Sequence, residues 1–109
     1  MAKTRAHIFV SGLVQGVFFR HRTKQLADSL NVKGWVKNLH DGRVEAVFEG
    51  EEDSVRKLVD FCKTGPRGAY VTNIDVLFEN FKNEFLALRK EPESVLYRRY
   101  TQLIHRAVS

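Results

Sequence analysis

Hydrophobic and polar residues alternate along four stretches of this chain and recur at helical spacing along two others. Alternation predicts β-strands, because successive side chains of a strand point to opposite faces, whereas recurrence on one side of a helical turn predicts helices. In one alternating stretch Val44, Ala46 and Phe48 are interleaved with polar residues, which predicts a sheet with one buried face. The expected strands cover residues 6–12, 34–39, 43–49 and 70–79. The expected helices cover about residues 20–31 and 52–63.

These elements follow one another in the order βαββαβ. This order is the ferredoxin-like split βαβ pattern, an α+β sandwich in which an antiparallel sheet carries two helices on one face. A chain of 109 residues has room for one compact domain of this kind, and we expect that domain to span residues 1–90.

The pattern changes after Lys90. Pro92 suits the first turn of a helix, and the following residues would give that helix one apolar and one basic face. The apolar face would hold Leu96, Tyr97, Tyr100, Leu103, Ile104, Ala107 and Val108, and the polar face Arg98, Arg99, Gln102, His105 and Arg106. We therefore expect residues 91–109 to form a C-terminal amphipathic helical extension. This helix would dock on its own domain, or it would give self-association by pairing with a second copy. Two alternatives for these residues stay open: a frayed tail, and a helix that binds a membrane surface or another protein.

The chain is basic, with a formal net charge of +5. Positive charge attracts phosphate esters, nucleic acid and acidic surfaces alike, so it narrows the class of partner without choosing one. The N-terminus has no signal-peptide pattern, and no stretch reaches the length of a transmembrane segment. A single cysteine cannot form an intramolecular disulfide, which favours a reducing, cytoplasmic location.

That cysteine, Cys62, invites comparison with the Cys-x5-Arg loop of cysteine phosphatases. The loop would need an arginine at position 68, which is Gly68, and Arg67 comes one residue early. Cys62 also shares a helix face with Leu58 and Val59, because residues three and four apart lie on the same side of a helix. The pattern predicts a core residue and not a nucleophile.

The first candidate site is the segment from Gly12 to Arg20, which reads Gly-Leu-Val-Gln-Gly-Val-Phe-Phe-Arg between the first expected strand and helix. Backbone N–H groups in such a loop and in the first helical turn have no intrahelical acceptors, so they can point at a bound oxyanion. Arg20 adds a planar, always-charged guanidinium that suits two phosphate oxygens. A phosphoryl or acyl-phosphate group is therefore the first ligand to consider. The segment lacks the Lys-Ser/Thr of a Walker A loop and the third glycine of a dinucleotide-binding loop.

Residues 34–45 read Gly-Trp-Val-Lys-Asn-Leu-His-Asp-Gly-Arg-Val-Glu and predict a hairpin that turns at Asp41-Gly42, with Asp41 serving the turn. Taken with the first loop, this segment resembles the two signature stretches of the acylphosphatase family, GxVQGVxFR and GWVxNxxDGxVE, and matches every defining position. Residues 65–71 also resemble the family's Gly-Pro…Ala-x-Val stretch. The resemblance covers about residues 6–89.

The resemblance implies hydrolysis of the carboxyl–phosphate bond of a small-molecule acyl phosphate, which gives a carboxylate and inorganic phosphate. It assigns Arg20 to the phosphate oxygens and Asn38 to the attacking water, and it implies a short fifth strand within residues 84–89. The backbone N–H groups that would form the phosphate cradle belong to Gln15, Gly16, Val17, Phe18, Phe19 and Arg20.

This chemistry requires no metal and no organic cofactor. The carboxylate leaving group is a weak base, so its departure needs little help from a general acid. Phosphoryl transfer can be catalysed largely by positioning and by neutralising charge. His7, His40 and His105 show no metal-ligand spacing with one another or with Cys62, so we expect no metal site.

Two other classes of function stay open. A non-catalytic module that senses anions or binds a partner would keep the phosphate cradle but hydrolyse nothing. Nucleic-acid binding would suit a basic ferredoxin-like domain, but an RNA-recognition domain carries stacking aromatic residues in a characteristic run on its third strand. Residues 43–48 lack that run, so we expect no specific nucleic-acid partner.

Overall fold

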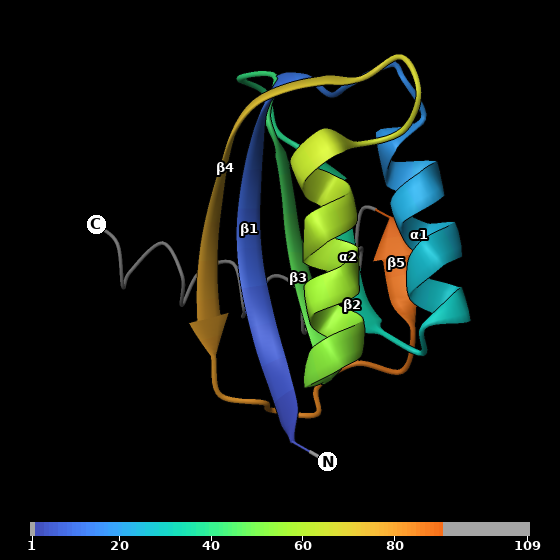
Figure 1. The fold of residues 1–109 in the computed structure, drawn as a ribbon, viewed down its shortest axis with the longest axis vertical. Coiled ribbons are helices and arrows are strands. Elements are labelled where there is room, and N and C mark those ends of the chain that lie inside the picture. Colours follow the sequence, from blue (N-terminus) through green and yellow to red (C-terminus); the bar gives the residue numbers. More distant parts are fainter. Residues whose placement is uncertain (1, 91–109) are drawn as a thin grey trace.

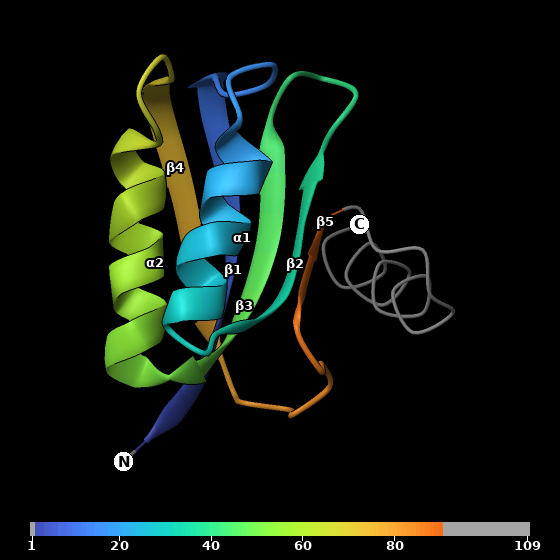
Figure 2. The same ribbon diagram turned by 90° about the vertical axis from the view of Figure 1, so that its right-hand side faces the viewer.

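The computed structural model describes residues 2–90, and these residues form one antiparallel sheet with a short added strand and two helices. The sheet order is β4-β1-β3-β2-β5, in which only the β2–β5 pair is parallel. Both helices cover the same face of the sheet (Figures 1 and 2). The elements are β1 (Lys3–Leu13), α1 (Phe19–Ser29), β2 (Lys33–Asn38), β3 (Val44–Glu51), α2 (Glu52–Thr64), β4 (Tyr70–Glu79) and β5 (Leu88–Lys90).

The ferredoxin-like prediction is confirmed for the four main strands and both helices. The implied fifth strand is present as β5, and it runs parallel to β2, so the sheet is not wholly antiparallel. The predicted extension at residues 91–109, together with its self-association, lies outside the described residues and stays a prediction. No helix in the described part of the chain is long and apolar enough to cross a membrane.

The main core lies between the sheet and the two helices. One face of β1 and β3 meets the apolar side of α2, and Phe19 enters this core from the first turn of α1. The core is lined by Ala6, Ile8, Val10, Val36, Val44, Ala46, Phe48, Val55, Leu58, Val59 and Cys62 among others. Because Phe19 is buried here, the beginning of α1 is held firmly against the sheet.

Cys62 is a core residue, as the sequence pattern predicts. It is fully buried, and burial raises the pKa of its thiol to about 12, with a hydrogen bond from the Thr23 side chain acting weakly in the opposite direction. At neutral pH the thiol is therefore protonated and shielded, which excludes it as a nucleophile.

The expectation that β3 has only one buried face is wrong. Glu45, Val47 and Glu49, on the side away from the helices, are all buried as well. The connection between β4 and β5, which crosses this side of the sheet near one end (Figure 2), contacts Val47 and Glu49, whereas Glu45 pairs with His7 of β1. Phe85 from this connection packs against Trp35 and Val47.

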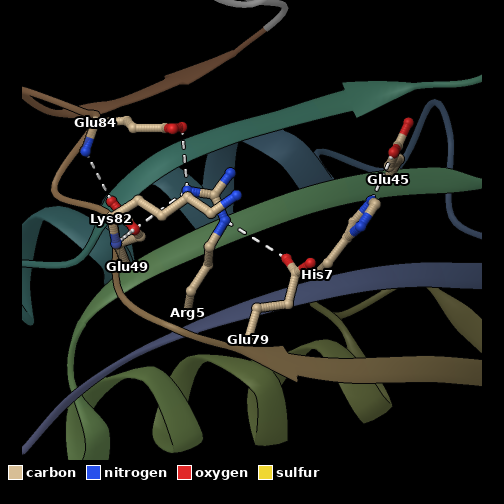
Figure 3. Close-up of polar contacts among 7 residues, drawn as sticks. All are labelled: Arg5, His7, Glu45, Glu49, Glu79, Lys82 and Glu84. Carbon is tan, nitrogen blue, oxygen red and sulfur yellow. Dashed lines mark hydrogen bonds and ion pairs between the residues drawn. The ribbon is translucent and has the colours of Figure 1, made fainter. Parts of the chain in front are cut away.

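A buried ion network holds the connection in place (Figure 3). The Glu49 carboxylate accepts hydrogen bonds from the backbone N–H groups of Lys82 (2.6 Å) and Glu84 (3.1 Å). It also accepts one from Nη1 of Arg5 at 3.1 Å, and the same Nη1 lies 3.2 Å from the Glu84 carboxylate. One carboxylate thus joins β3, β1 and the segment that leads to β5. Buried charges are stable only when they are paired and hydrogen-bonded, so each of these contacts supports the others.

We expect Glu49→Ala to lower the free energy of unfolding by about 3–5 kcal/mol, because it removes a buried carboxylate that pairs with Arg5 and accepts the N–H groups of Lys82 and Glu84. Urea unfolding followed by circular dichroism measures the change. Glu52→Ala is the matched control: Glu52 pairs with Arg56 on the surface, and such pairs contribute about 1 kcal/mol or less. Equal losses in the two variants would contradict a structural role for the network.

We expect the Cys62 thiol to react with a disulfide reagent at pH 8 only as fast as the protein unfolds, because the folded thiol is buried and its pKa is about 12. Rates measured across a urea series should follow the unfolding rate, and Cys62→Ala should show no reaction. Rapid modification of the fully folded protein would show that the thiol is accessible.

Candidate active site

The loop between β1 and α1, residues 14–18, follows a distortion near the end of β1. The register with β4 shifts between Ser11 and Gly12, which is a β-bulge. Gly12 has a φ of +123°, and a Cβ built on it would lie 2.1 Å from the backbone oxygen of Tyr70. Only glycine fits this position, because the chain there is both left-handed and in contact with another backbone.

The same loop presents a row of backbone N–H groups without acceptors. Phe18, the N-cap of α1, makes no side-chain cap, and the first turn contains no acidic residue. The first helical bond runs from the N–H of Arg22 to the oxygen of Phe18 at 3.0 Å, so the three preceding helical N–H groups have no acceptor within the helix. Among the described residues, the N–H groups of residues 15–18 also donate no backbone hydrogen bond.

The loop borders a cavity of about 420 Å³. Of the loop residues in the predicted cradle, Gly16 and Phe18 line this cavity, whereas Gln15 and Val17 do not. Its lining residues come from the loop, the first turn of α1 and the end of β2. These segments lie at the same end of the sheet (Figure 2). The cavity is lined by Val14, Gly16, Phe18, Phe19, Arg20, His21 and Asn38. Arg20 from the first turn of α1 and Asn38 from the end of β2 therefore come together as the sequence predicts.

Asn38 is the last residue of β2, opposite Val44 in the register. Its Oδ1 atom is buried and has no hydrogen-bond partner among residues 2–90. A buried polar oxygen without a partner is costly, and an ordered water or a ligand in the adjoining cavity would satisfy it.

The hairpin that carries Asn38 is closed by the predicted turn. The N–H of Leu39 donates to the oxygen of Arg43 at 2.8 Å, and the N–H of Gly42 donates to the oxygen of Leu39 at 3.2 Å. Asp41 accepts a hydrogen bond from the backbone N–H of Arg43 at 3.1 Å, which holds the pKa of its carboxyl below the usual range. Asp41 serves the turn, as expected.

Comparisons with known proteins identify the family. The family model described as Acylphosphatase matches residues 6–87, which is most of the chain. The chain belongs to the acylphosphatase family. It is a hydrolase that acts on acyl phosphates, and its substrates are small molecules of that class.

Individual acylphosphatases show how close the similarity is. The chain is 54% identical over 80 residues to the acylphosphatase of Haloarcula marismortui, covering 73% of this chain and 88% of the relative. It is 49% identical over 86 residues to that of Syntrophobacter fumaroxidans, covering 79% and 89%. The solved acylphosphatases of Coxiella burnetii and Bacillus subtilis superpose with TM-scores of 0.77 at 39% and 35% identity. Each solved structure covers 82% of this chain, and the match spans 93% and 99% of theirs.

Other residues considered in the sequence analysis are placed as follows. Among the described residues, no group of three His, Cys, Asp or Glu side chains could hold a metal ion. His7 is not in the cavity: its Nε2 atom lies 2.7 Å from Glu45 on the sheet face away from the helices (Figure 3). Val17, whose N–H belongs to the predicted cradle, packs its side chain against the core.

Sequence reasoning missed the role of the Gln15 side chain. Its Nε2 donates to the backbone oxygens of Leu39 (2.7 Å) and Arg43 (2.9 Å), so it links the loop to the hairpin that carries Asn38. The partners are carbonyl groups, which every residue has, and they lie 24 and 28 positions away along the chain. No spacing or residue type could therefore reveal them.

We expect Gln15→Leu to lower kcat by as much as about 100-fold, because a shift of about 1 Å between the loop and Asn38 misplaces the reacting groups. Inhibition by inorganic phosphate should change much less, since the loop amides stay in place. Steady-state kinetics with benzoyl phosphate and phosphate measure both quantities. Gln25→Leu, which removes a surface amide of α1, is the control, and equal effects of the two variants would exclude a positioning role for Gln15.

Proposed function

We propose that this acylphosphatase binds the phosphoryl group with the N–H groups of residues 15–20 and the guanidinium of Arg20, and that Asn38 positions the attacking water. The observation that carries the proposal is the shared cavity, which brings the loop, Arg20 and Asn38 together although they come from separate elements. The cytoplasmic location belongs to the same proposal, and the single buried free cysteine supports it.

Phosphate binding follows from the backbone. Among the described residues, the N–H groups of residues 15–18 donate no backbone hydrogen bond, and Gly16 and Phe18 line the cavity. The partial positive charge at the N-terminus of α1 also favours an anion there. Arg20 in this first turn opposes the helix dipole, so a bound anion is the better reason for an arginine there. The planar guanidinium of Arg20 can bind two phosphate oxygens and neutralise the charge that develops on them.

Asn38 supports the positioning of a water. Its buried Oδ1 atom can accept a hydrogen bond from that water, while the amide nitrogen can donate to a phosphate oxygen. A carboxamide is not a base at neutral pH, so it orients the nucleophile without taking its proton. Among residues 2–90, no carboxylate and no lysine lines the cavity, although His21 does.

The reaction then balances without a protein base. The water oxygen forms a bond to phosphorus as the bond between phosphorus and the acyl oxygen breaks. The carboxylate leaves with the electron pair of that bond, and the water proton passes to a phosphate oxygen of the substrate. The protein contributes orientation and charge neutralisation, which supply most of the rate enhancement in phosphoryl transfer.

We expect Arg20→Ala and Asn38→Ala each to lower kcat/KM for benzoyl phosphate by about 10²–10³, because each removes one preorganised group. The measurement is hydrolysis at neutral pH in the presence of a metal chelator, which should leave the rate of the unaltered protein unchanged.

Matched controls separate site effects from general charge and folding effects. Arg22→Ala removes the same charge two residues along α1, from a side chain bonded to Gln25 and outside the cavity. Asn73→Ala removes an exposed amide on β4. Both controls should hydrolyse benzoyl phosphate within about twofold of the unaltered protein. Phosphate binding without any hydrolysis by the folded, unaltered protein would instead favour the anion-sensing alternative.

A further inference from the structure

The cavity is larger than a phosphoryl group requires. At roughly 30 Å³ for each water-sized group, the about five heavy atoms of a phosphoryl group need no more than about 150 Å³. The cavity measures about 420 Å³, so more than half of it is left for the acyl part of the substrate. The residues that border this remaining space therefore bear on which acyl group is accepted.

Phe18 is the least expected of these residues. It has a φ of 63°, a left-handed conformation that costs a non-glycine residue about 1–2 kcal/mol. Its side chain is 76% exposed, so the ring gains little from burial in return. Gly16, two residues earlier, has a similar φ of +74° and is the residue type that such a backbone favours. The stability of the fold does not explain a phenylalanine here.

Contact with a ligand does explain it. Phe18 lines the cavity next to the phosphate loop, and an exposed aromatic face there can cover a flat apolar group. A feature that costs stability and lies at a site is more often kept for function than for folding.

His21 borders the same space. Like Phe18, His21 lines the cavity, and it lies in the first turn of α1. His21 is also exposed, which leaves its ring available for contact. Two rings that line the cavity suit a planar acyl group better than a methyl group.

We propose that Phe18 and His21 select the acyl group, and that this acylphosphatase prefers acyl phosphates with an aromatic or similarly planar apolar acyl part over acetyl phosphate. The proposal rests on the proposed function, because it takes the phosphoryl group to occupy the loop. Neither ring is assigned a part in the chemical step.

The test compares kcat/KM for benzoyl phosphate and acetyl phosphate in Phe18→Ala and His21→Ala. We expect the ratio of the two values to fall about two- to tenfold in Phe18→Ala, the range that aromatic contacts contribute, with a smaller fall in His21→Ala. In His21→Ala, which leaves the proposed cradle of residues 15–20 intact, acetyl phosphate hydrolysis and inhibition by inorganic phosphate should stay within about twofold. Leu13→Ala, an exposed apolar residue of β1 that does not line the cavity, should leave the ratio unchanged.

Phe18→Gly separates a ligand role from a folding role. Relief of the left-handed strain should raise Tm by about 4–8 °C, while the preference for benzoyl phosphate falls. A lower Tm would show that Phe18 serves the fold, and an unchanged substrate ratio in Phe18→Ala would show that the ring does not contact the acyl group. Either result would overturn the proposal. Failure of the proposed function differs from both, because acetyl phosphate hydrolysis would then survive in Arg20→Ala.

Discussion

The backbone N–H groups at the start of α1 are the constraint on which this site depends. A helix cannot satisfy its own first amides, and here neither a capping side chain nor an acidic residue does so. The loop that precedes the helix adds further N–H groups without backbone acceptors in the described part of the chain. In the proposed function these N–H groups face the phosphoryl group across a concavity, and their fixed positions supply the preorganisation that electrostatic catalysis requires.

The rest of the fold places other groups around that concavity. Burial of Phe19 fixes the start of α1 against the sheet, and antiparallel pairing of β2 with β3 brings Asn38 to the same end. The Gln15 side chain then ties loop and hairpin together through two carbonyl groups. On the sheet face away from the helices, the Glu49 carboxylate accepts hydrogen bonds from Arg5 and from the connection to β5. Phe18, whose backbone is left-handed and strained, lines the cavity.

The sequence predicted what depends on periodicity and on signature residues. Alternation predicted the strands. The loop and hairpin signatures pointed to Arg20 and Asn38, and both residues line one cavity in the structure. The sequence could not predict the double-sided burial of β3, because Glu45 and Glu49 have the composition of a solvated face and their partners, His7 and residues 82–84, are distant in the chain. Nor could it predict the left-handed backbone of Phe18, since aromatic residues rarely adopt it.

Titration of the protein with inorganic phosphate, followed by the chemical shifts of individual amides in NMR spectra, examines the concavity itself. If the loop and the start of α1 hold the phosphoryl group, the largest changes will occur at the backbone amides of residues 15–21 and at the side-chain amide of Asn38. The changes will saturate at one phosphate per chain and will weaken strongly in Arg20→Ala. Changes centred on another part of the molecule, or saturation unaffected by Arg20→Ala, would contradict a phosphate site built from these amides.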